Sequence, residues 1–355
     1  MNWNGLRVFL TGHTGFKGSW LALWLQQRGA QVHGFALDPA TMPNLYDVAG
    51  VAAGMASDTR ADLADQARLA AAMTAAQPDL VLHLAAQALV RESYRDPLGT
   101  FATNVQGTAH VLEAARTIAG LRAVVIVTTD KVYRSEEWAY PYRETDHLGG
   151  NDPYSASKAA AELVVASYRA SFFGAERHPA HIASARAGNV IGGGDWSAER
   201  LVPDCLRAAD AKQDLVLRFP EAVRPWQHVL EPLSGYVALA EALLGSNAQA
   251  FAQAWNFGPD ATGEATVGDV ARSVLAAADG TGSVVTPPRE DTYHETGLLR
   301  LDSSLARARL GWQPRWSLGT AIDRTVAWHK AWREQADMRA TTLGQIAQYE
   351  AAPAQ

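Results

Sequence analysis

Residues 9–20, FLTGHTGFKGSW, decide how this chain folds. Gly12, Gly15 and Gly18 are spaced three residues apart between an apolar run and a helical pattern over residues 16–28. A tight turn from a strand into a helix needs residues without a Cβ, and so does close approach of a pyrophosphate to a helix N-terminus. A glycine triplet alone is weak evidence, but the flanking strand and helix make it specific. The stretch predicts a dinucleotide-binding unit that opens the fold.

The alternation of strand and helix patterns continues through the first half of the chain. Short apolar runs at 7–10, 31–37, 79–85 and 123–129 are separated by longer helical patterns. Strands that are apolar on both faces are typical of a parallel sheet covered by helices on its two sides. The expected fold class is therefore α/β, with a doubly wound parallel sheet of the Rossmann type.

The pattern changes after about residue 185, where loops rich in Gly, Pro and Trp begin. Long loops inside a compact domain are usually functional. We therefore expect a smaller C-terminal substrate-binding lobe beside the Rossmann domain. The expected division is 1–188 for the Rossmann domain with about 224–262 returning to it, 189–223 and 263–340 for the lobe, and 341–355 for a C-terminal tail that frays at its end.

Composition excludes several classes of protein. The chain has 355 residues and a formal net charge of −6, so it lacks the basic footprint of a nucleic-acid partner. Cys205 is the single cysteine, which excludes an intramolecular disulfide and a zinc site of several thiolates, and no metal is expected. The apolar stretch near the N-terminus is too short to span a bilayer and lacks a signal-peptide cleavage pattern. We expect a cytoplasmic protein with no membrane partner.

The residue that would hold the adenosine ribose has two interpretations. Asp38 follows Gly18 by about 20 residues, the usual distance for a carboxylate that binds the ribose hydroxyls of NAD. It also precedes Pro39, where a turn residue is equally expected, and Ala36 is an alternative alignment for this position. Lys17 is a cation that would instead favour the 2′-phosphate of NADP. We expect NAD, with NADP as the alternative.

Other cofactor candidates follow the third and fourth strand regions. Asp62 and Leu63 suit the adenine edge, and residues 83–87, HLAAQ, provide small side chains where the backbone passes the cofactor. The complete candidate set for the cofactor is Gly12, Thr14, Gly15, Phe16, Lys17, Gly18, Asp38, Asp62, Leu63, Ala85, Ala86 and Gln87, together with Tyr154 and Lys158.

The stretch DPYSASK, residues 152–158, predicts a catalytic pair at the start of a helix. Asp152 suits the N-cap and Pro153 the first helical position. Tyr154 and Lys158 then lie one turn apart on the same face. A phenol titrates at about pH 10 in isolation, so it needs a neighbouring cation to act as a base at neutral pH. Lys158 is placed to supply that charge.

With the glycine loop and this pair, the chain resembles the extended short-chain dehydrogenase/reductase family over nearly its whole length. In that family a Ser or Thr, a Tyr and a Lys meet over the nicotinamide, which the resemblance maps onto Thr129, Tyr154 and Lys158. An acidic residue after the threonine, followed by a second ionisable residue, marks the nucleotide-sugar 4,6-dehydratases within the family. Here those positions are Asp130 and Lys131.

Lys131 departs from the Asp-Glu pair of the dTDP-glucose and GDP-mannose dehydratases. With the stretches TGHTGFKGSW, RAGNVIGGGDW and RPWQHVLEPLSGY, it makes the chain similar to family members that use CDP-sugars. The resemblance implies that Tyr154 takes the proton of the C4 hydroxyl and that protonated Asp130 is the acid for water leaving C6. Relatives use a glutamate at the position of Lys131 as the C5 base. Lys131 serves as that base only if burial or like charge lowers its pKa, and otherwise it stabilises the enolate.

Three other interpretations stay open at this point. A 4-epimerase or reductase of the same fold, or a dehydratase for another nucleotide-sugar, would use the same scaffold. A dinucleotide-sensing regulator would keep the Rossmann domain without any chemistry. The alternative for Asp130 and Lys131 themselves is an exposed ion pair at a strand end, worth about 0 to 1 kcal/mol.

Candidates for the nucleotide-sugar site come from both halves of the chain. Asn189 and Arg224 match phosphate-contacting positions of the family, and a guanidinium fork suits a diphosphate. Arg91, Trp196 and His294 complete the set. The implied partner is a CDP-sugar, and the helices at 104–118 and 154–173, whose counterparts pair across a two-fold axis in the family, imply a homodimer.

Overall fold

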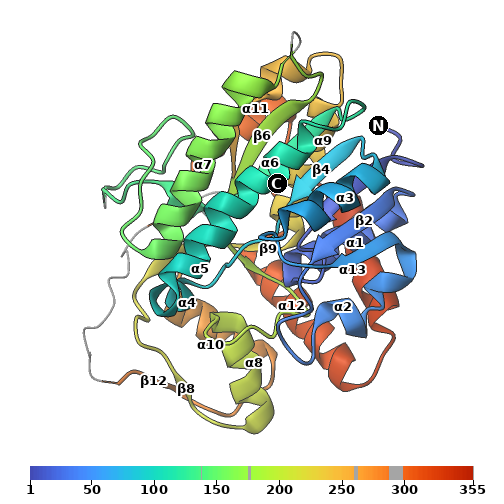
Figure 1. The fold of residues 1–355 in the computed structure, drawn as a ribbon. Coiled ribbons are helices and arrows are strands. Elements are labelled where there is room, and N and C mark those ends of the chain that lie inside the picture. The colour runs from blue at the N-terminus through green and yellow to red at the C-terminus, as the bar shows by residue number, and fades with distance from the viewer. Residues whose placement is uncertain (137, 175–176, 260–262, 288–298, 355) are drawn as a thin grey trace.

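A seven-stranded parallel sheet forms the centre of the molecule (Figure 1), in a computed structural model that describes residues 1–136, 138–174, 177–259, 263–287 and 299–354. The strand order is β10-β6-β5-β4-β1-β2-β3, and every neighbouring pair is parallel. The order reverses between β1 and β4, which opens a crevice at their carboxyl ends. The predicted doubly wound fold is confirmed. The strands are β1 Arg7–Thr11, β2 Gln31–Ala36, β3 Met55–Arg60, β4 Leu80–His83, β5 Ala123–Val127, β6 His181–Ala187 and β10 Ala254–Phe257.

Helices cover both faces of this sheet, because successive side chains of a strand point to opposite faces. In β5, Val124 and Ile126 join the core beneath α3, α6 and α7, whereas Val125 and Val127 join the core beneath α1 and α9. The helices are α3 Gln66–Ala76, α6 Gly107–Ala115 and α7 Pro153–Phe172 on one face, and α1 Phe16–Gln27 and α9 Leu230–Leu243 on the other.

A smaller lobe has a core of its own. Its sheet has the order β11-β9-β7, with β7 and β9 parallel and β9 and β11 antiparallel. Cys205, Val274 and Ile322 are buried together where three helices of the lobe meet. The lobe elements are β7 Asn189–Ile191, α8 Leu201–Ala211, β9 Val223–His228, β11 Glu264–Thr266, α10 Val267–Ala277 and α12 Leu318–Arg333.

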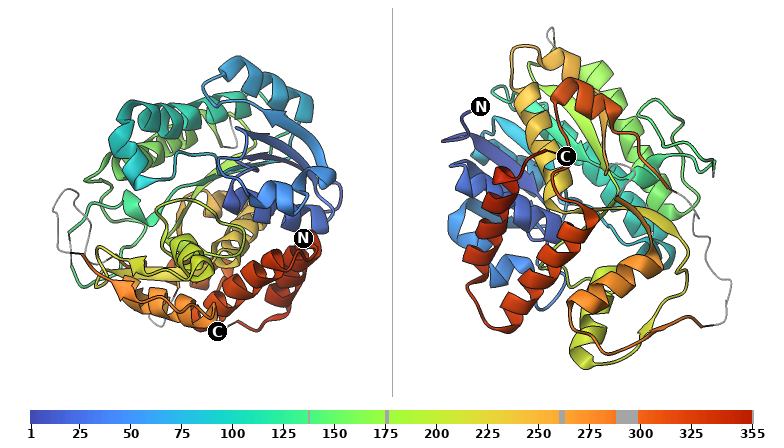
Figure 2. Two further views of the ribbon diagram at one scale, coloured as in Figure 1. Left: turned by 90° about the horizontal axis from the view of Figure 1, so that it is seen from below. Right: turned by 180° about the vertical axis from the view of Figure 1, so that it is seen from behind.

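The C-terminal segment differs from the expected tail. Residues Met338–Ala351 form helix α13, which lies against α1, and Figure 2 shows the C-terminal helices in red beside the N-terminal elements in blue. Tyr349 is buried edge-on against Trp24, and Trp24 donates through Nε1 to Glu350 at 2.8 Å. The sequence of this helix has few apolar residues, because part of the face that it buries is polar. That face includes Thr342, whose hydroxyl accepts from Trp328. The expectation of a tail over 341–355 was therefore wrong.

The structure also departs at two places from the division between domain and lobe that the sequence predicted. Within 224–262, β9 belongs to the sheet of the lobe, whereas β10 is an edge strand of the main sheet. Within 263–340, Trp312 and Trp316 are buried in the core beneath α1 and α9 rather than in the lobe.

The remaining elements are short connectors. None of the helices among the described residues has the length and apolar character needed to cross a membrane. The connectors are α2 Leu45–Val48, α4 Val90–Arg95, α5 Pro97–Phe101, β8 Leu215–Val216, β12 Val284–Val285, α11 Ser304–Leu310, a π-helical turn at Ala102–Gln106, and 3₁₀ turns at Val51–Gly54, Asp130–Val132 and Ala248–Phe251.

Candidate active site

The glycine loop is closed tightly against the end of β4. Gly12 has a φ of +75°, and a Cβ there would lie 2.7 Å from the backbone nitrogen of Ala85. A Cβ on Gly18 would collide with the carbonyl oxygen of Gly12. No side chain caps the N-terminus of α1 at Gly15. The loop therefore offers the uncapped helix start and the close backbone approach that a pyrophosphate requires.

His13 connects this loop to strands β2 and β3. No local pattern in the sequence predicts these contacts. Its Nε2 lies 2.8 Å from Oδ1 of Asp58 in β3, and Tyr46 donates to the other oxygen of Asp58 at 2.5 Å. A Cβ on Gly34 would meet the His13 ring at 2.6 Å, so the imidazole needs a glycine in β2. The anchor ties the loop to two strands.

The ribose end of the predicted cofactor site is exposed. The Asp38 side chain is 86% accessible and lies 3.4 Å from Nη1 of Arg60. Ala36 ends β2 and is buried. Thr14 donates to the carbonyl oxygen of Leu37 at 2.8 Å, which fixes the chain between these two positions. A direct role for Asp38 with the ribose stays a prediction.

Asp62, Leu63 and Gln87 make contacts within the protein. The Asp62 carboxylate accepts from the backbone of Ala64, and Leu63 is buried in the core beneath α3 and α6. Gln87 is held through its backbone by Asn104. These contacts fix the chain that follows β3 and β4.

Lys17 is the main departure from the sequence-based expectation at the cofactor site. Its ammonium donates to the hydroxyl of Tyr236 in α9 at 3.2 Å. Burial lowers the pKa of Lys17 to about 7; the charges of Arg200 and Lys158 act in the same direction, and that of Asp130 opposes them. The side chain therefore lies with the catalytic candidates, and its role in binding the cofactor stays a prediction.

Thr129, Tyr154 and Lys158 meet where β5 ends against α7. Asp152 caps α7 by accepting from the backbone of Ser155, and Pro153 occupies the first turn, as predicted. Burial raises the pKa of Tyr154 to about 12, and a hydrogen bond with Thr129 opposes that rise. Lys158 donates to the carbonyl oxygen of Val127 at 3.3 Å.

The action of Lys158 on Tyr154 stays a prediction. The charges that act most on the phenol are Asp130, which raises its pKa, and Arg200, which lowers it. Burial also lowers the pKa of Lys158 to about 8, against the opposing charge of Glu162 one turn further along α7.

Asp130 is buried with half of its carboxyl group unsatisfied. Its Oδ1 accepts from the Thr129 hydroxyl at 3.0 Å, and Oδ2 has no hydrogen-bond partner. Burial raises its pKa, although Lys131, Thr129 and Arg224 oppose the rise. A Cβ on Gly188 would lie 2.9 Å from Oδ2, so this glycine leaves the space that the carboxyl group occupies. The alternative of an exposed Asp-Lys pair is wrong for Asp130.

Several cations surround this single carboxyl group. Lys17, Lys131 and Arg224 each act on Asp130, and Arg224 is itself buried. Arg200, which acts on Tyr154 and Lys17, is held by Asp195 at 3.1 Å and was not among the residues predicted from the sequence. Such a concentration of positive charge suits an anionic ligand, although the net charge of the chain is −6.

The other residues predicted to bind the substrate contact different parts of the protein. Arg91 pairs with Glu199 at 3.1 Å, and Asn189 begins β7 beside β9. Trp196 packs edge-on against Trp328 and Trp332 of α12. His294 lies outside the described residues.

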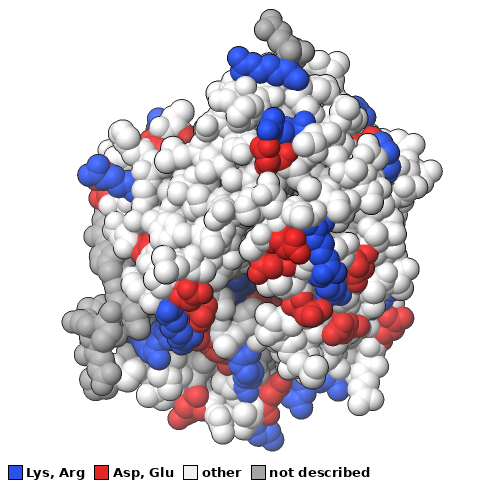
Figure 3. Space-filling view, viewed as in Figure 1, with Lys and Arg blue, Asp and Glu red and all other residues white. Residues whose placement is uncertain are grey.

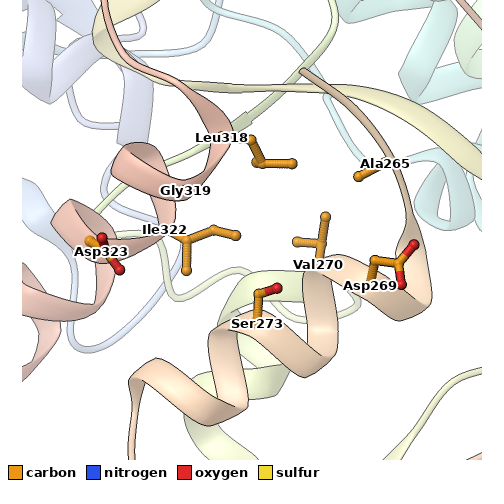
Figure 4. A pocket seen from close by; sticks show the side chains of 8 residues that line it. All are labelled: Ala265, Asp269, Val270, Ser273, Leu318, Gly319, Ile322 and Asp323. Atoms are coloured by element: carbon orange, nitrogen blue, oxygen red, sulfur yellow. The ribbon is translucent and has the colours of Figure 1, made fainter. Parts of the chain in front are cut away.

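One hollow of the surface lies away from these residues. It measures about 310 Å³ between α10 and α12, and Val270, Leu318 and Ile322 point into it (Figure 4). Asp269 and Asp323 are at its rim. It shares no residue with the catalytic cluster, and the chemistry described above places the candidate active site at the end of β5 instead.

The site has the features of a dinucleotide-binding enzyme of the short-chain dehydrogenase/reductase type. These features are the glycine loop, the carboxyl end of β5 and the Tyr-Lys helix. More narrowly, residues 9–325 match the model of the family described as GDP-mannose 4,6 dehydratase. The chain belongs to this family.

Individual relatives narrow the comparison further. The chain is 45% identical to CDP-glucose 4,6-dehydratase of Salmonella typhimurium, covering 99% of this chain and 98% of the relative. It is 29% identical to UDP-glucose 4-epimerase of Mycolicibacterium smegmatis, over 90% and 97% of the two chains. The crystal structure of DesIV, a dTDP-glucose 4,6-dehydratase from Streptomyces venezuelae with NAD and TYD bound, matches with a TM-score of 0.78 and 26% identity, covering 94% of this chain and 99% of DesIV.

Proposed function

We propose that this protein is an NAD-dependent lyase that dehydrates CDP-glucose to CDP-4-keto-6-deoxyglucose. The observation that carries the proposal is Asp130, a buried carboxyl group with a raised pKa and one unpartnered oxygen beside Thr129. Elimination of water needs an acid for the departing hydroxyl, whereas a 4-epimerase does not. The identity to the Salmonella dehydratase supports CDP as the nucleotide.

The residues of the site divide the reaction between them. Bound NAD would accept hydride from C4 and return it to C6. Tyr154 takes the proton of the C4 hydroxyl, and the resulting ketone acidifies the proton on C5. Asp130 then protonates the C6 hydroxyl, which leaves as water when the C5 proton is removed, and C5 regains a proton when hydride enters C6. Lys131, whose charge acts on Asp130, stabilises the enolate or removes the C5 proton.

NAD and the nucleotide-sugar would be held at opposite ends of the crevice. The uncapped start of α1 and the close approach of Gly12 to Ala85 fit a pyrophosphate. Arg224 and Arg200 fit the diphosphate of the sugar nucleotide, because guanidinium groups bind phosphate oxygens in pairs. The crystal structure of DesIV has NAD bound, which supports the choice of cofactor.

The direct test is incubation with NAD and each of CDP-, dTDP-, UDP- and GDP-glucose, followed by mass spectrometry. We expect loss of one water from CDP-glucose, and no dehydration of any of the four would refute the proposal. Asp130→Asn should then abolish dehydration, while Asp269→Asn, the same change on the exposed surface of the lobe, should leave it unchanged. An epimerase would give an isomer of equal mass and would tolerate Asp130→Asn.

We further propose a homodimer formed through α5, α6 and α7. Leu98 and Phe101 of α5 and Leu163 and Phe172 of α7 are exposed, with Leu163 at 61%. Few charged side chains occupy the surface over α6 and α7 (Figure 3). Light scattering should show a dimer that Leu163→Asp dissociates, whereas Val216→Asp, at 60% exposure in the lobe, should not. With its buried cysteine, such a dimer fits a cytoplasmic location.

A further inference from the structure

One face of α7 holds the carboxyl end of β5 at three successive residues. Residues four apart on a helix share a face, and Tyr154, Lys158 and Glu162 form such a row, all of them buried. Each member of the row contacts a different residue of the strand end. Tyr154 bonds with Thr129, Lys158 donates to the Val127 carbonyl oxygen at 3.3 Å, and Glu162 accepts from the Thr128 hydroxyl at 2.5 Å.

Glu162 differs from the other two because it is itself fixed from a third element. Arg186 of β6 donates to both of its oxygens, at 3.0 Å and 2.9 Å. Ser184 donates to Oε2 at 2.7 Å. Both oxygens are therefore bonded twice, and the side chains of Glu162 and Arg186 are 2% and 4% accessible.

Arg186 also reaches the other side of the catalytic turn. Its Nη1 donates to the Tyr133 hydroxyl at 2.9 Å and to the Glu144 carbonyl oxygen at 3.1 Å. Tyr133 in turn donates to Asn256 at 2.7 Å. The ion pair thus holds the chain at Thr128, before the catalytic residues 129–131, and at Tyr133, after them.

We propose that Glu162 and Arg186 are positioning residues whose buried ion pair clamps residues 128–133 at both ends, so that Thr129 and Asp130 are presented to Tyr154. Neither residue takes part in the reaction. The inference rests on the proposed function, because it assigns these residues to the same catalytic turn.

The clamp also affects charge in the site. Burial would raise the pKa of Glu162, but Arg186, Ser184 and Thr128 hold it below its ordinary value, so the carboxylate is charged. Its charge opposes the burial that lowers the pKa of Lys158. The other groups that face Lys158 are Lys17 of α1 and His83 of β4, and Arg169 of α7 faces Glu162. Removal of the Glu162 charge should therefore make Lys158 lose its proton at lower pH.

Glu162→Gln tests the clamp, because glutamine keeps the shape of the side chain and removes its charge. We expect kcat for CDP-glucose to fall about tenfold with KM within about twofold, and the alkaline limb of the pH profile to move to lower pH. Glu162→Asp should keep that limb in place, because the charge is retained. Thr128→Val, which removes one bond to the clamp and keeps the ion pair, should lower kcat about fivefold without moving the limb.

The control is Glu231→Gln, the same change at an equally buried carboxyl group that holds Tyr349 and the backbone of residues 315 and 316. It should lower thermal stability and leave the kcat profile in place. A pH profile of Glu162→Gln identical to wild type, with activity lost only in proportion to unfolded protein, would overturn the proposal. If Glu162→Gln does not fold, full kcat in Thr128→Val overturns it. An inactive wild type would instead refute the proposed function, and the inference with it.

Discussion

Two groups of buried charge lie at the carboxyl end of β5, and they are satisfied to different degrees. Glu162 has both oxygens bonded twice and an arginine partner. Asp130 has one oxygen bonded to Thr129 and the other without a partner, among cations that it does not bond directly. A buried polar group without a partner is costly, so a fold that retains one usually does so for function.

The two carboxyl groups bond to neighbouring threonines, and we assign one to structural support and the other to the reaction. Thr128 bonds to the satisfied carboxylate, and Thr129 bonds to the unsatisfied one. The first carboxylate remains charged because Arg186 compensates for its burial, while burial keeps the second protonated over a wider range of pH. A carboxyl group that holds a proton can donate it, whereas a paired carboxylate can only hold its partners in place.

The largest effect is expected when the satisfied pair is broken. Glu162→Ala leaves the Arg186 guanidinium buried without its partner and should lower the free energy of unfolding by about 3 to 5 kcal/mol. Denaturant titration measures this change. The double variant Glu162→Ala/Arg186→Leu removes the uncompensated charge and should recover most of the loss. A single variant less than about 1 kcal/mol below wild type would contradict the comparison.

Tyr154, the tyrosine beside the unsatisfied carboxyl group, should respond in activity rather than in stability. Tyr154→Phe removes the hydroxyl that bonds with Thr129 and, in the proposed mechanism, takes the C4 proton, so kcat should fall about a hundredfold to a thousandfold. Its thermal stability should stay close to that of wild type, because the ring remains packed. Steady-state assays with CDP-glucose and calorimetry test both statements. Tyr133→Phe is the matched control, since Tyr133 is equally buried but supports the turn; it should lose less activity.

The fold could be predicted, and a candidate catalytic stretch proposed, because their signals are local. The glycines of residues 12–18, the apolar runs of the sheet and the Tyr-Lys spacing each lie within a few residues of sequence. Helix α13 was not predicted, because much of what it buries is polar and satisfied by distant groups such as Trp328. Periodicity detects apolar faces, and it does not detect buried hydrogen bonds.

The supporting residues could not be predicted because their partners are distant in the chain. Arg186 lies 24 residues after Glu162 in the sequence, and nothing near either residue indicates that they meet. Lys17 was grouped with the cofactor-binding candidates because it belongs to the glycine loop, and its side chain extends toward α9. The direction of a long side chain is set by the elements packed around it, and one local motif does not contain that information.

Asp130→Asn should stabilise the protein, with an effect that depends on pH. Burial raises the pKa of Asp130 above its unfolded value, so the carboxyl group lowers stability as pH rises from about 4 through its folded pKa. An amide has no charge to bury, and the variant should be more stable than wild type by about 1 kcal/mol at pH 8. The difference should vanish below about pH 4. Glu162→Gln should show the opposite sign at pH 8, and a destabilised Asp130→Asn at that pH would argue against a buried, uncompensated carboxyl group.

The smallest effect is expected for the partly exposed charges at residues 91–95 and 199. Glu199 pairs with Arg91 at 3.1 Å and with Arg95 at 3.3 Å, and these arginine side chains are 34% and 63% accessible. Exposed pairs contribute about 0 to 1 kcal/mol, so Arg91→Gln should change the free energy of unfolding by less than about 1 kcal/mol, and Arg95→Gln should leave it indistinguishable from that of wild type. Denaturant titration of both variants, with KM for CDP-glucose measured alongside, separates packing from binding. Because the two arginines share Glu199, a rise in KM confined to Arg91→Gln would place Arg91 against the substrate, whereas equal and small changes would assign both to the surface.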